Sequence, residues 1–575
     1  MLGVLLRLLP LLAPFALLTA CAPPPESPAG GGAKLYSVIL RGGTIYDGRG
    51  GKPFVGDVAI SGDTIAAVGA LGDARGAAEI DASGLAVAPG FINMLSHAEE
   101  SLLQDARGQS DIRQGVTLEV FGEFSMGPLN DRMKRDWKKL QAHIQYEYAW
   151  TTLGDYLDGM ERRGISPNIA SFVGAGTVRE NVIGNDDRRA TPEELERMRG
   201  LVAQAMCEGA LGLSTALIYP PDTYASTAEL IELAKTASTH GGMFTAHIRN
   251  EGSRIEEAIE ELISIARGAR IPAEIYHLKL AGKDNWAKLD AVVRRIEAAR
   301  AEGLAITADM YTYTAGATGF DAAMPKWVQA GGFDAWAARL ADPEVRARVK
   351  KEMADPKADW DNFYQGAGPD KILLTGFKNP ALQPLIGKTL AEIAAARGTS
   401  PDDTAMDLVI EDQTRVSVVY FLMSEENVRR QIALPWVSFV SDSEALAPEG
   451  VFLKSNPHPR AYGNFARLLG KYVREERVLT LEEAVRRLTS LPADNLRLAR
   501  RGALAVGNFA DVAVFDPKSV GDRATFEAPH QLATGMIHVF VNGVQVLKGG
   551  EHTGAKPGRA VRGRGAHGPG CAAPR

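Results

Sequence analysis

The sequence predicts an α/β protein, a parallel β/α barrel whose two flanking segments together build a β-sandwich. In the middle of the chain, strand-like runs alternate with amphipathic helical segments about every 30 residues, the length of one βαβ unit. At both ends, short runs of alternating apolar and polar residues are separated by glycine and aspartate, which is typical of antiparallel strands. The 575 residues suffice for a barrel of about 250 residues with insertions and a second domain.

The N-terminus has the features of an export signal. Residues 1–20 form an apolar run with a single charge at Arg7, and Leu18-Thr19-Ala20 lead directly into Cys21. Small residues before a cysteine are typical of a lipobox, so we predict a signal peptide over 1–20 and a lipid-anchored, exported bacterial protein facing the periplasm. A cleaved signal with an incidental cysteine is the alternative. The proline-rich residues 22–34 are predicted to be a linker.

Composition and charge limit the classes of partner. The chain is 45% hydrophobic and 23% charged, with a formal net charge of −6, as expected of a globular protein with a large core. Lysine and arginine do not cluster, so we expect no nucleic-acid partner and no membrane contact except through lipidated Cys21. The Arg- and Gly-rich end, residues 553–575, is predicted to be disordered. After Cys21 only Cys207 and Cys571 remain, so no disulfide framework is expected.

The domain boundaries follow from these patterns. Residues 35–88 and 500–552 are predicted to form the composite β-sandwich, and residues 89–499 the barrel. A stretch over about 311–373 does not follow the regular βα spacing and is predicted to be an insertion or lid beside the barrel.

Two histidines fall where such barrels place their chemistry. Predicted strands end near Ser214, His247, His277 and Asp309, so successive ends are 33, 30 and 32 residues apart. This spacing puts both imidazoles at the carboxyl ends of neighbouring strands, where they could bind one zinc-like ion. The alternative is that each is a structural hydrogen-bonding residue.

Two carboxylates also end strand-like runs. Glu123 follows VTLEVFG and Asp442 follows VSFVS. A carboxylate in this position can ligate a metal or transfer protons. Either could instead cap a helix or pair with an arginine.

Beyond these single residues, the chain resembles the N-acyl-D-amino-acid deacylase (D-aminoacylase) branch of the amidohydrolase superfamily from about Tyr36 to Arg562. The matching segments are APGFIN (88–93), QGVTLEVFGE (114–123), GALGLSTALIYPP (209–221), AHIRNEG (246–252), YHLKLAGKDNW (276–286), SDSEA (441–445), HPRAYGNFARLLG (458–470), LTSLPA (488–493) and GNFADVAVFDP (507–517). The resemblance implies a distorted (β/α)8 TIM-like barrel with a β-sandwich, zinc at the strand ends, and hydrolysis of the amide of a small N-acyl-D-amino acid.

The same resemblance suggests individual roles. His247 and His277 fall on the family's two metal-binding histidines, and Asp442 falls on its catalytic aspartate. Three further residues, Lys279, Tyr219 and Arg460, lie in segments that the family uses near the substrate carboxylate.

The chain departs from the family pattern at two positions. The usual H-x-H pair is Leu95-Ser96-His97 here, so His97 remains as a metal-binding candidate while Leu95 cannot donate to a metal. The family's bridging cysteine corresponds to Phe124, and Glu123 beside it could supply an oxygen ligand. We therefore expect one tight zinc site, formed by His247, His277 and Glu123, and the departures put a second site in doubt.

These residues suggest a hydrolytic mechanism. A metal would lower the pKa of water toward about 7, and Asp442 would take the proton and return it to the leaving amine. The metal, with His97, would stabilise the tetrahedral oxyanion. Lys279 or Arg460 would hold the substrate carboxylate. The alternatives are an amidohydrolase acting on dipeptides or on cyclic amides or imides, and a catalytically impaired surface lipoprotein that binds a ligand.

Overall fold

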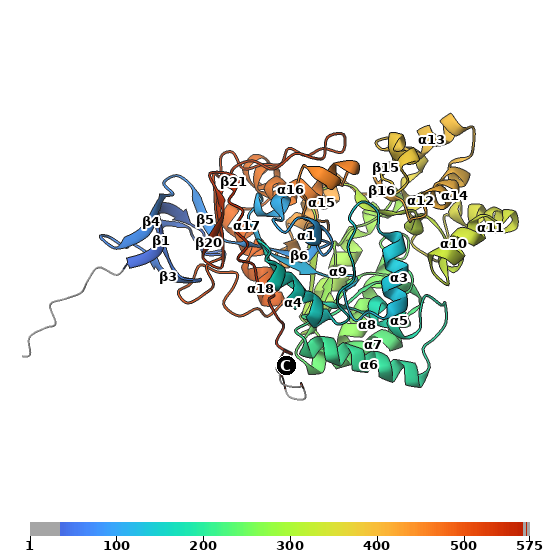
Figure 1. Ribbon diagram of the computed structural model, residues 1–575, viewed down its shortest axis with the longest axis horizontal. Coiled ribbons are helices and arrows are strands. Elements are labelled where there is room, and N and C mark those ends of the chain that lie inside the picture. The colour runs from blue at the N-terminus through green and yellow to red at the C-terminus, as the bar shows by residue number, and fades with distance from the viewer. Residues whose placement is uncertain (1–34, 567, 569–570, 572–575) are drawn as a thin grey trace, which may run out of the picture.

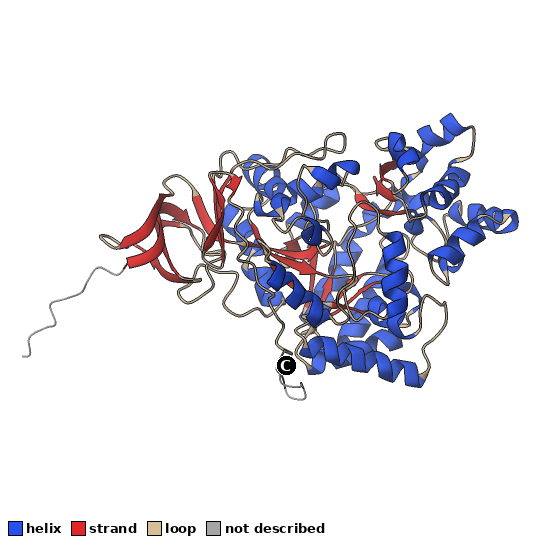
Figure 2. Cartoon of the chain, in the orientation of Figure 1, coloured by secondary structure: helices blue, strands red, loops and turns tan. Residues whose placement is uncertain are grey.

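The structure is a computed structural model that describes residues 35–566, 568 and 571 (Figures 1 and 2). The predicted signal peptide, Cys21 and the 22–34 linker lie outside the described residues. Within the described part, none of the helices is long and apolar enough to cross a membrane.

Strands from both chain ends join in one nine-stranded sheet, at the left of Figure 1. The join is antiparallel, with Ala88 opposite Ala513. Apolar side chains from both ends, including Ile60 and Phe540, are fully buried together. The two ends therefore build one β domain. Its strands are β1 (Leu35–Ile45), β2 (Phe54–Ser61), β3 (Thr64–Gly69), β4 (Arg75–Asp81), β5 (Ala86–Pro89), β18 (Val512–Phe515), β19 (Met536–Val541), β20 (Val544–Lys548) and β21 (Glu551–His552).

The middle of the chain forms a barrel of parallel strands. Only Phe172 separates β8 from β9, so these two act as one barrel strand that pairs with β7 on one side and with β10 on the other. The barrel closes where the Asp442 amide donates to the Leu95 carbonyl (3.0 Å). Its strands are β6 (Phe91–Ser96), β7 (Val116–Phe121), β8 (Asn168–Ser171), β9 (Val173–Gly174), β10 (Gly212–Ala216), β11 (Met243–His247), β12 (Ala273–Ile275), β13 (Ile306–Met310) and β17 (Val437–Phe439).

Helices cover the outside of the barrel. The sequence sets their ends: α6 begins with a capping box between Thr191 and Glu194, and Pro192 occupies its first turn. Between His247 and His277, the apolar face of α8 is buried. These helices are α1 (Ser101–Gln104), α2 (Gln109–Ile112), α3 (Asp131–Leu140), α4 (Leu153–Arg163), α5 (Ala175–Val182), α6 (Pro192–Cys207), α7 (Thr227–Thr239), α8 (Ile255–Ala269), α9 (Leu289–Ala301), α15 (Glu425–Ile432), α16 (Arg460–Arg467), α17 (Leu481–Leu488) and α18 (Ser490–Asn495).

The insertion after β13 is longer than the predicted 311–373. A three-stranded antiparallel sheet, ordered β14-β16-β15, continues it to Tyr420, and it has its own apolar core (right of Figure 1). Helices and strands also follow one another inside the insertion, so the local sequence pattern does not mark where it ends. The elements are β14 (Gly316–Gly319), α10 (Phe333–Leu340), α11 (Pro343–Met353), α12 (Phe363–Ala367), β15 (Ile372–Gly376), α13 (Leu390–Arg397), α14 (Pro401–Asp412) and β16 (Ser417–Tyr420).

The predicted disorder of 553–575 is wrong for residues 553–566, which lie against the barrel. Backbone amides of Gly558 and Val561 donate to Ile165 and Ile169 at 2.8 and 2.7 Å. Glycine permits this contact, because a Cβ on Gly558 would lie 1.9 Å from the Pro167 carbonyl. Backbone pairing needs no apolar pattern, so composition gave no sign of it.

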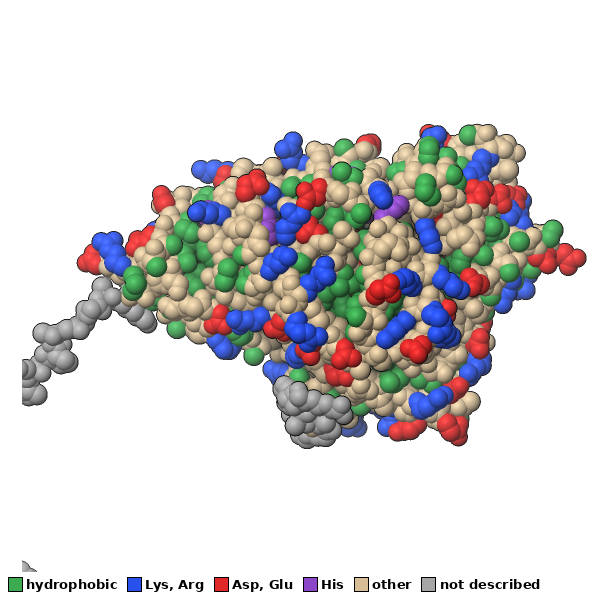
Figure 3. Space-filling view, in the orientation of Figure 1, with side chains coloured by type: hydrophobic (Ala, Val, Ile, Leu, Met, Phe, Trp, Pro, Cys, Tyr) green, Lys and Arg blue, Asp and Glu red, His purple; other side chains and the backbone are tan. Residues whose placement is uncertain are grey.

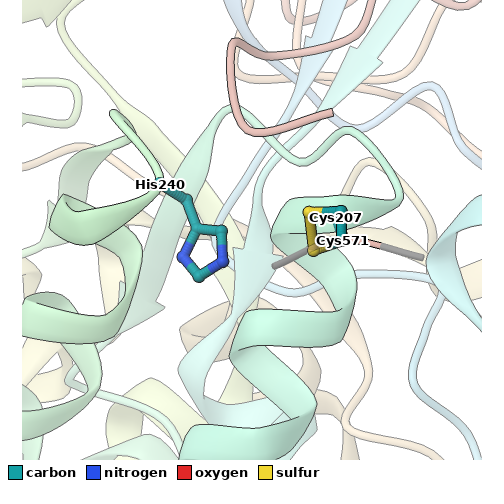
Figure 4. Close-up of side chains that lie close together, drawn as sticks. All are labelled: Cys207, His240 and Cys571. Atoms are coloured by element: carbon teal, nitrogen blue, oxygen red, sulfur yellow. A yellow bond between two sulfur atoms is a disulfide. The ribbon is translucent and has the colours of Figure 1, made fainter. Parts of the chain in front are cut away.

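A disulfide fastens this C-terminal segment, contrary to expectation. Cys207, the last residue of α6, is bonded to Cys571 across 364 residues of sequence. His240 lies beside the bridge (Figure 4). We define residues 553–566 together with Cys571 as the C-terminal strap.

Candidate active site

Five polar side chains gather at one end of the barrel. His97 follows β6, Glu123 follows β7, His247 ends β11, His277 follows β12 and Asp442 follows β17. All of these strands are parallel, so their carboxyl ends meet at the same rim. The structure thus brings together the residues that the sequence predicted to carry the chemistry.

A carboxylate and two imidazoles converge at the centre of this rim. Oε1 of Glu123 lies 2.9 Å from Nε2 of His277 and 3.2 Å from Nδ1 of His247. The two rings are 4.5 Å apart between centroids, and all three residues are buried. Two imidazole nitrogens and one carboxylate oxygen are a donor set that fits zinc and leaves a fourth position for water or substrate.

The backbone explains why Glu123, and not Phe124, enters the site. Glu123 has a positive φ of 65°, which turns its side chain inward beyond the end of β7. Before it, Gly122 is required because a Cβ there would lie 2.0 Å from the hydroxyl of Tyr276. Phe124 is 36% exposed, and its ring stacks on His97.

A second group of donors adjoins the first. Nε2 of His97 lies 3.0 Å from Oδ1 of Asp442 and 3.8 Å from Oε2 of Glu123. Glu123 therefore belongs to both groups. The side chain of Leu95 is fully buried in an apolar cluster, so this second group has one imidazole where an H-x-H pair would supply two.

Backbone conformation is strained at three of these residues. His277 and Asp442 have positive φ values of 34° and 48°, like Glu123. For residues other than glycine, such conformations cost about 1–3 kcal/mol each and persist where surrounding contacts enforce them. One such contact is from the amide of His277 to the buried carboxylate of Asp309.

The two cations predicted near the substrate both have carboxylate partners. Arg460 lies 2.7 Å from Oδ2 of Asp442. Lys279 donates from Nζ to Oε1 of Glu251 at 2.6 Å. Sequence reasoning missed Glu251, although it stands four residues after His247 in the AHIRNEG segment.

Two tyrosines border the site. The ring of Tyr219 meets His247 edge-on at 5.5 Å, and its hydroxyl bonds Thr318 of the insertion at 2.6 Å. Tyr311, which sequence reasoning also missed, has Lys279 and Arg460 against its ring. Its hydroxyl is buried and has no hydrogen-bond partner among the residues that the structure describes.

Burial and neighbouring charges set the protonation of the carboxylates. Burial raises the pKa of Glu123, but hydrogen bonds from His247 and His277 outweigh it and hold this pKa well below its usual range. Burial likewise opposes ionisation of Glu251, yet Lys279 and the two imidazoles bring its pKa to about 2. Both carboxylates are therefore ionised at neutral pH.

In the second group of donors, neighbouring charges likewise outweigh burial at His97 and Asp442. Burial lowers the pKa of His97, but the hydrogen bond to Asp442 and the charge of Glu123 raise it to about 9. Burial raises the pKa of Asp442, and Arg460, His277 and His97 outweigh it, so this pKa lies below its usual range.

Comparisons with known proteins agree with this geometry. Residues 78–547 match the amidohydrolase family. D-aminoacylase of Alcaligenes xylosoxydans xylosoxydans is 34% identical over 536 residues, which cover 92% of this chain and 97% of the relative. A solved D-aminoacylase structure, from work on its binuclear metal centre, is 33% identical with a TM-score of 0.77, covering 92% of this chain and all of the other.

A further solved structure contains both a metal and an inhibitor. It is N-acyl-D-glutamate deacylase of Bordetella bronchiseptica with zinc and a phosphonate that mimics the tetrahedral intermediate. It is 30% identical, with a TM-score of 0.76, and the match covers 92% of this chain and all of that chain. Sequence, fold and rim geometry thus agree, and the chain belongs to the amidohydrolase family, as a metal-dependent hydrolase related to D-aminoacylase.

Proposed function

We propose that this protein hydrolyses the amide bond of N-acyl-D-amino acids, releasing the D-amino acid and a carboxylate. One observation carries the proposal: the Glu123 carboxylate lies between His247 and His277. His97 lies near Glu123 on one side and contacts Asp442 on the other, so the proposed base adjoins the proposed zinc site. Solved structures of D-aminoacylase and of N-acyl-D-glutamate deacylase share this fold over their full length.

Glu123, His247 and His277 would hold a zinc ion, which would supply Lewis-acid activation of water and of the substrate carbonyl. Asp442 takes the proton from the attacking water on Oδ1 and delivers it to the leaving nitrogen. Arg460 holds the other oxygen of Asp442, which leaves Oδ1 facing His97. His97, as a hydrogen-bond donor, stabilises negative charge that develops on the carbonyl oxygen.

The substrate carboxylate is held beside Tyr311. Its buried hydroxyl offers a donor that no described residue uses, and Lys279 supplies a positive charge on the same side. Tyr219 borders the site at the insertion, where its hydroxyl bonds Thr318, and this position supports a role in contacting the amino-acid side chain.

We propose one tight zinc ion and, at most, a weakly bound second one. The first donor group has three ligands, while the second, formed by His97 and Asp442 with the shared Glu123, lacks the imidazole that Leu95 replaces. Replacement of Leu95 with histidine is expected to raise the zinc content from about one to about two ions per chain.

One experiment tests the function. The protein without residues 1–20 is purified, its metal is measured by elemental analysis, and hydrolysis is assayed with N-acetyl-D- and N-acetyl-L-amino acids, dipeptides and hydantoins. Faster hydrolysis of the N-acetyl-D-amino acids supports the proposal. Faster hydrolysis of dipeptides or hydantoins would assign the site to another amidohydrolase reaction, and a zinc-free, inactive protein would make it a binding protein.

We further propose that the protein is exported and anchored through lipidated Cys21. The apolar run before Cys21 supports this. The Cys207–Cys571 disulfide supports it as well, since disulfides persist mainly in oxidising compartments. Metabolic labelling with palmitate, lost in Cys21→Ser, tests the anchor.

A further inference from the structure

Glu251 lies across the two histidine rings from Glu123. Its side chain is 1% exposed, and Oε1 lies 3.1 Å from Nδ1 of His277 and 3.7 Å from Nε2 of His247. These are the ring nitrogens that do not contact Glu123, which lies instead near Nε2 of His277 and Nδ1 of His247. One carboxylate therefore adjoins the outer nitrogens of both imidazoles.

The same oxygen is also the partner of Lys279. Nζ of Lys279 lies 2.6 Å from Oε1 of Glu251 and 2.7 Å from Nδ1 of His277. An ammonium group can only donate hydrogen bonds, so Nδ1 can accept from it only while that nitrogen carries no proton. A protonated Nδ1 must instead donate to Glu251. Glu251 and Lys279 thus compete for Nδ1 of His277, and the charge of Glu251 favours a proton on that nitrogen while it also attracts the ammonium group.

Contacts from two other segments fix Glu251 in place. Its backbone amide donates to Oδ2 of Asp361 in the insertion at 2.8 Å. Its carbonyl accepts from the amide of Ala281, also at 2.8 Å. Oε2 is buried and has no hydrogen-bond partner in the described part of the chain. Fixing a carboxylate with one unused buried oxygen costs stability, which favours a functional reason for keeping it.

We propose that Glu251 is a positioning residue that links the metal site to the substrate-carboxylate site. Its negative charge, 3.1 Å from Nδ1 of His277 and 3.7 Å from Nε2 of His247, favours the ring protons on these nitrogens, so that Nδ1 of His247 and Nε2 of His277 are free to bind zinc. At the same time it sets the direction of the Lys279 ammonium group. The second half of this role rests on the proposed function of Lys279, whereas the first half concerns zinc alone.

The substitution Glu251→Gln tests the proposal. Glutamine has the same shape but no charge, so it holds the ring protons less strongly. Carboxylates that orient metal-binding histidines typically affect metal affinity by 10–100-fold. The zinc dissociation constant, measured by competition with a chromogenic chelator, is therefore expected to rise by that factor. The visible spectrum of the cobalt(II)-substituted protein is expected to shift as well.

Glu229→Gln is the matched control. Glu229 is also a buried carboxylate, 5% exposed, and its partner is Arg179 at 2.7 Å. Its loss removes a buried ion pair of similar kind, whose partner is Arg179 and not a histidine of the zinc site. Zinc affinity is expected to stay within twofold of the unmodified protein, even if the midpoint of thermal unfolding falls.

Zinc affinity of Glu251→Gln within twofold of the unmodified protein, with an unchanged cobalt spectrum, would overturn the proposal. If this variant does not fold by circular dichroism, Glu251→Asp serves instead. Aspartate keeps the charge but withdraws it by one methylene, so its zinc affinity is expected to be reduced, and an unchanged affinity would again refute the role. None of these measurements needs a substrate. An unmodified protein that binds zinc but hydrolyses no N-acyl-D-amino acid would refute the proposed function only.

The KM of the substrate provides the second readout. Because Glu251 orients Lys279, Glu251→Gln is expected to raise KM for an N-acyl-D-amino acid at saturating zinc. The factor by which KM rises should exceed the factor by which kcat falls. A fall in kcat alone, with KM unchanged, would contradict the link to the substrate carboxylate.

Discussion

The two oxygens of Asp442 have different partners: Oδ2 lies 2.7 Å from Arg460, while Oδ1 lies 3.0 Å from Nε2 of His97. Arg460, which the sequence predicts near the substrate carboxylate, contacts the proposed base in this structure. A guanidinium in this position keeps the carboxylate ionised and fixes its orientation, which leaves Oδ1 as the atom available for proton transfer.

Asp442→Asn is therefore expected to reduce kcat by about 10²–10⁴-fold, the usual contribution of a positioned acid–base group. The amide is nearly the same size and Asp442 lies outside the first donor group, so zinc content should be nearly unchanged. Steady-state kinetics and elemental analysis of the same preparation check both points. Turnover close to that of the unmodified protein would remove Asp442 from the mechanism.

His247→Ala and His277→Ala are each expected to abolish tight zinc binding, because each removes one of three donors from the first group. Zinc per chain should fall from about one to near zero after dialysis. His538→Ala is the control, since His538 lies on β19 in the β domain. A His247 or His277 variant that keeps its zinc would refute the ligand assignment.

Gly122→Ala is expected to destabilise the protein by about 1–3 kcal/mol, the typical cost of overpacking, because the new methyl group would meet the hydroxyl of Tyr276. It should also displace Glu123 and weaken zinc binding. Gly51→Ala is the matched control, since a Cβ at Gly51 has nothing within 4 Å. Equal unfolding midpoints for the two variants would contradict the predicted contact.

Reduction of the Cys207–Cys571 disulfide is expected to lower stability by about 2–4 kcal/mol, because the bond closes a loop spanning 364 residues of sequence. Thermal unfolding with and without dithiothreitol measures the difference. Cys207→Ser should unfold at the midpoint of the reduced protein and show no response to reductant. A response in that variant would mean that reduction acts elsewhere.

Asp222 is expected to make stability depend on pH. Burial raises its pKa to about 7, although hydrogen bonds from Thr215 and Ala216 oppose the shift. A carboxyl whose pKa is higher in the folded state contributes stability below its unfolded pKa of about 4, and this contribution is lost as pH rises to about 7.

Asp222→Asn cannot ionise, so its stability relative to the unmodified protein should increase between pH 4 and 7, by on the order of 1 kcal/mol per pH unit at most. Urea unfolding at several pH values gives this difference. Parallel pH profiles for the two proteins would show that Asp222 is not the responsible group.

Much of this arrangement could be predicted from local sequence. The period of the apolar residues and the spacing of strand ends placed His247 and His277 on neighbouring strands, because parallel βα units repeat at a nearly constant length. Glu123 was harder to place, since alternation along a strand would have turned it away from the site. Its left-handed backbone beyond β7 reverses that expectation, and no residue pattern in QGVTLEVFGE signals the turn.

Long-range contacts could not be predicted in this way. Cys207 and Cys571 are 364 residues apart, and Gly558 pairs with Ile165 through backbone atoms alone. Such contacts depend on how the finished barrel lies against the end of the chain. Glu251 was missed for a related reason, because its importance comes from three neighbours and not from its own position in a strand. On the face shown in Figure 3, acidic and basic side chains are mixed, so the charges on this face do not indicate a further binding site.

The left-handed backbone at Glu123, His277 and Asp442 has an evolutionary consequence. At each position glycine would fit the backbone without steric cost, yet it would remove a donor or the proposed base. Glycine at these positions would therefore relieve backbone strain only by removing the groups on which the hydrolase depends. The catalytic rim persists only where turnover itself is under selection.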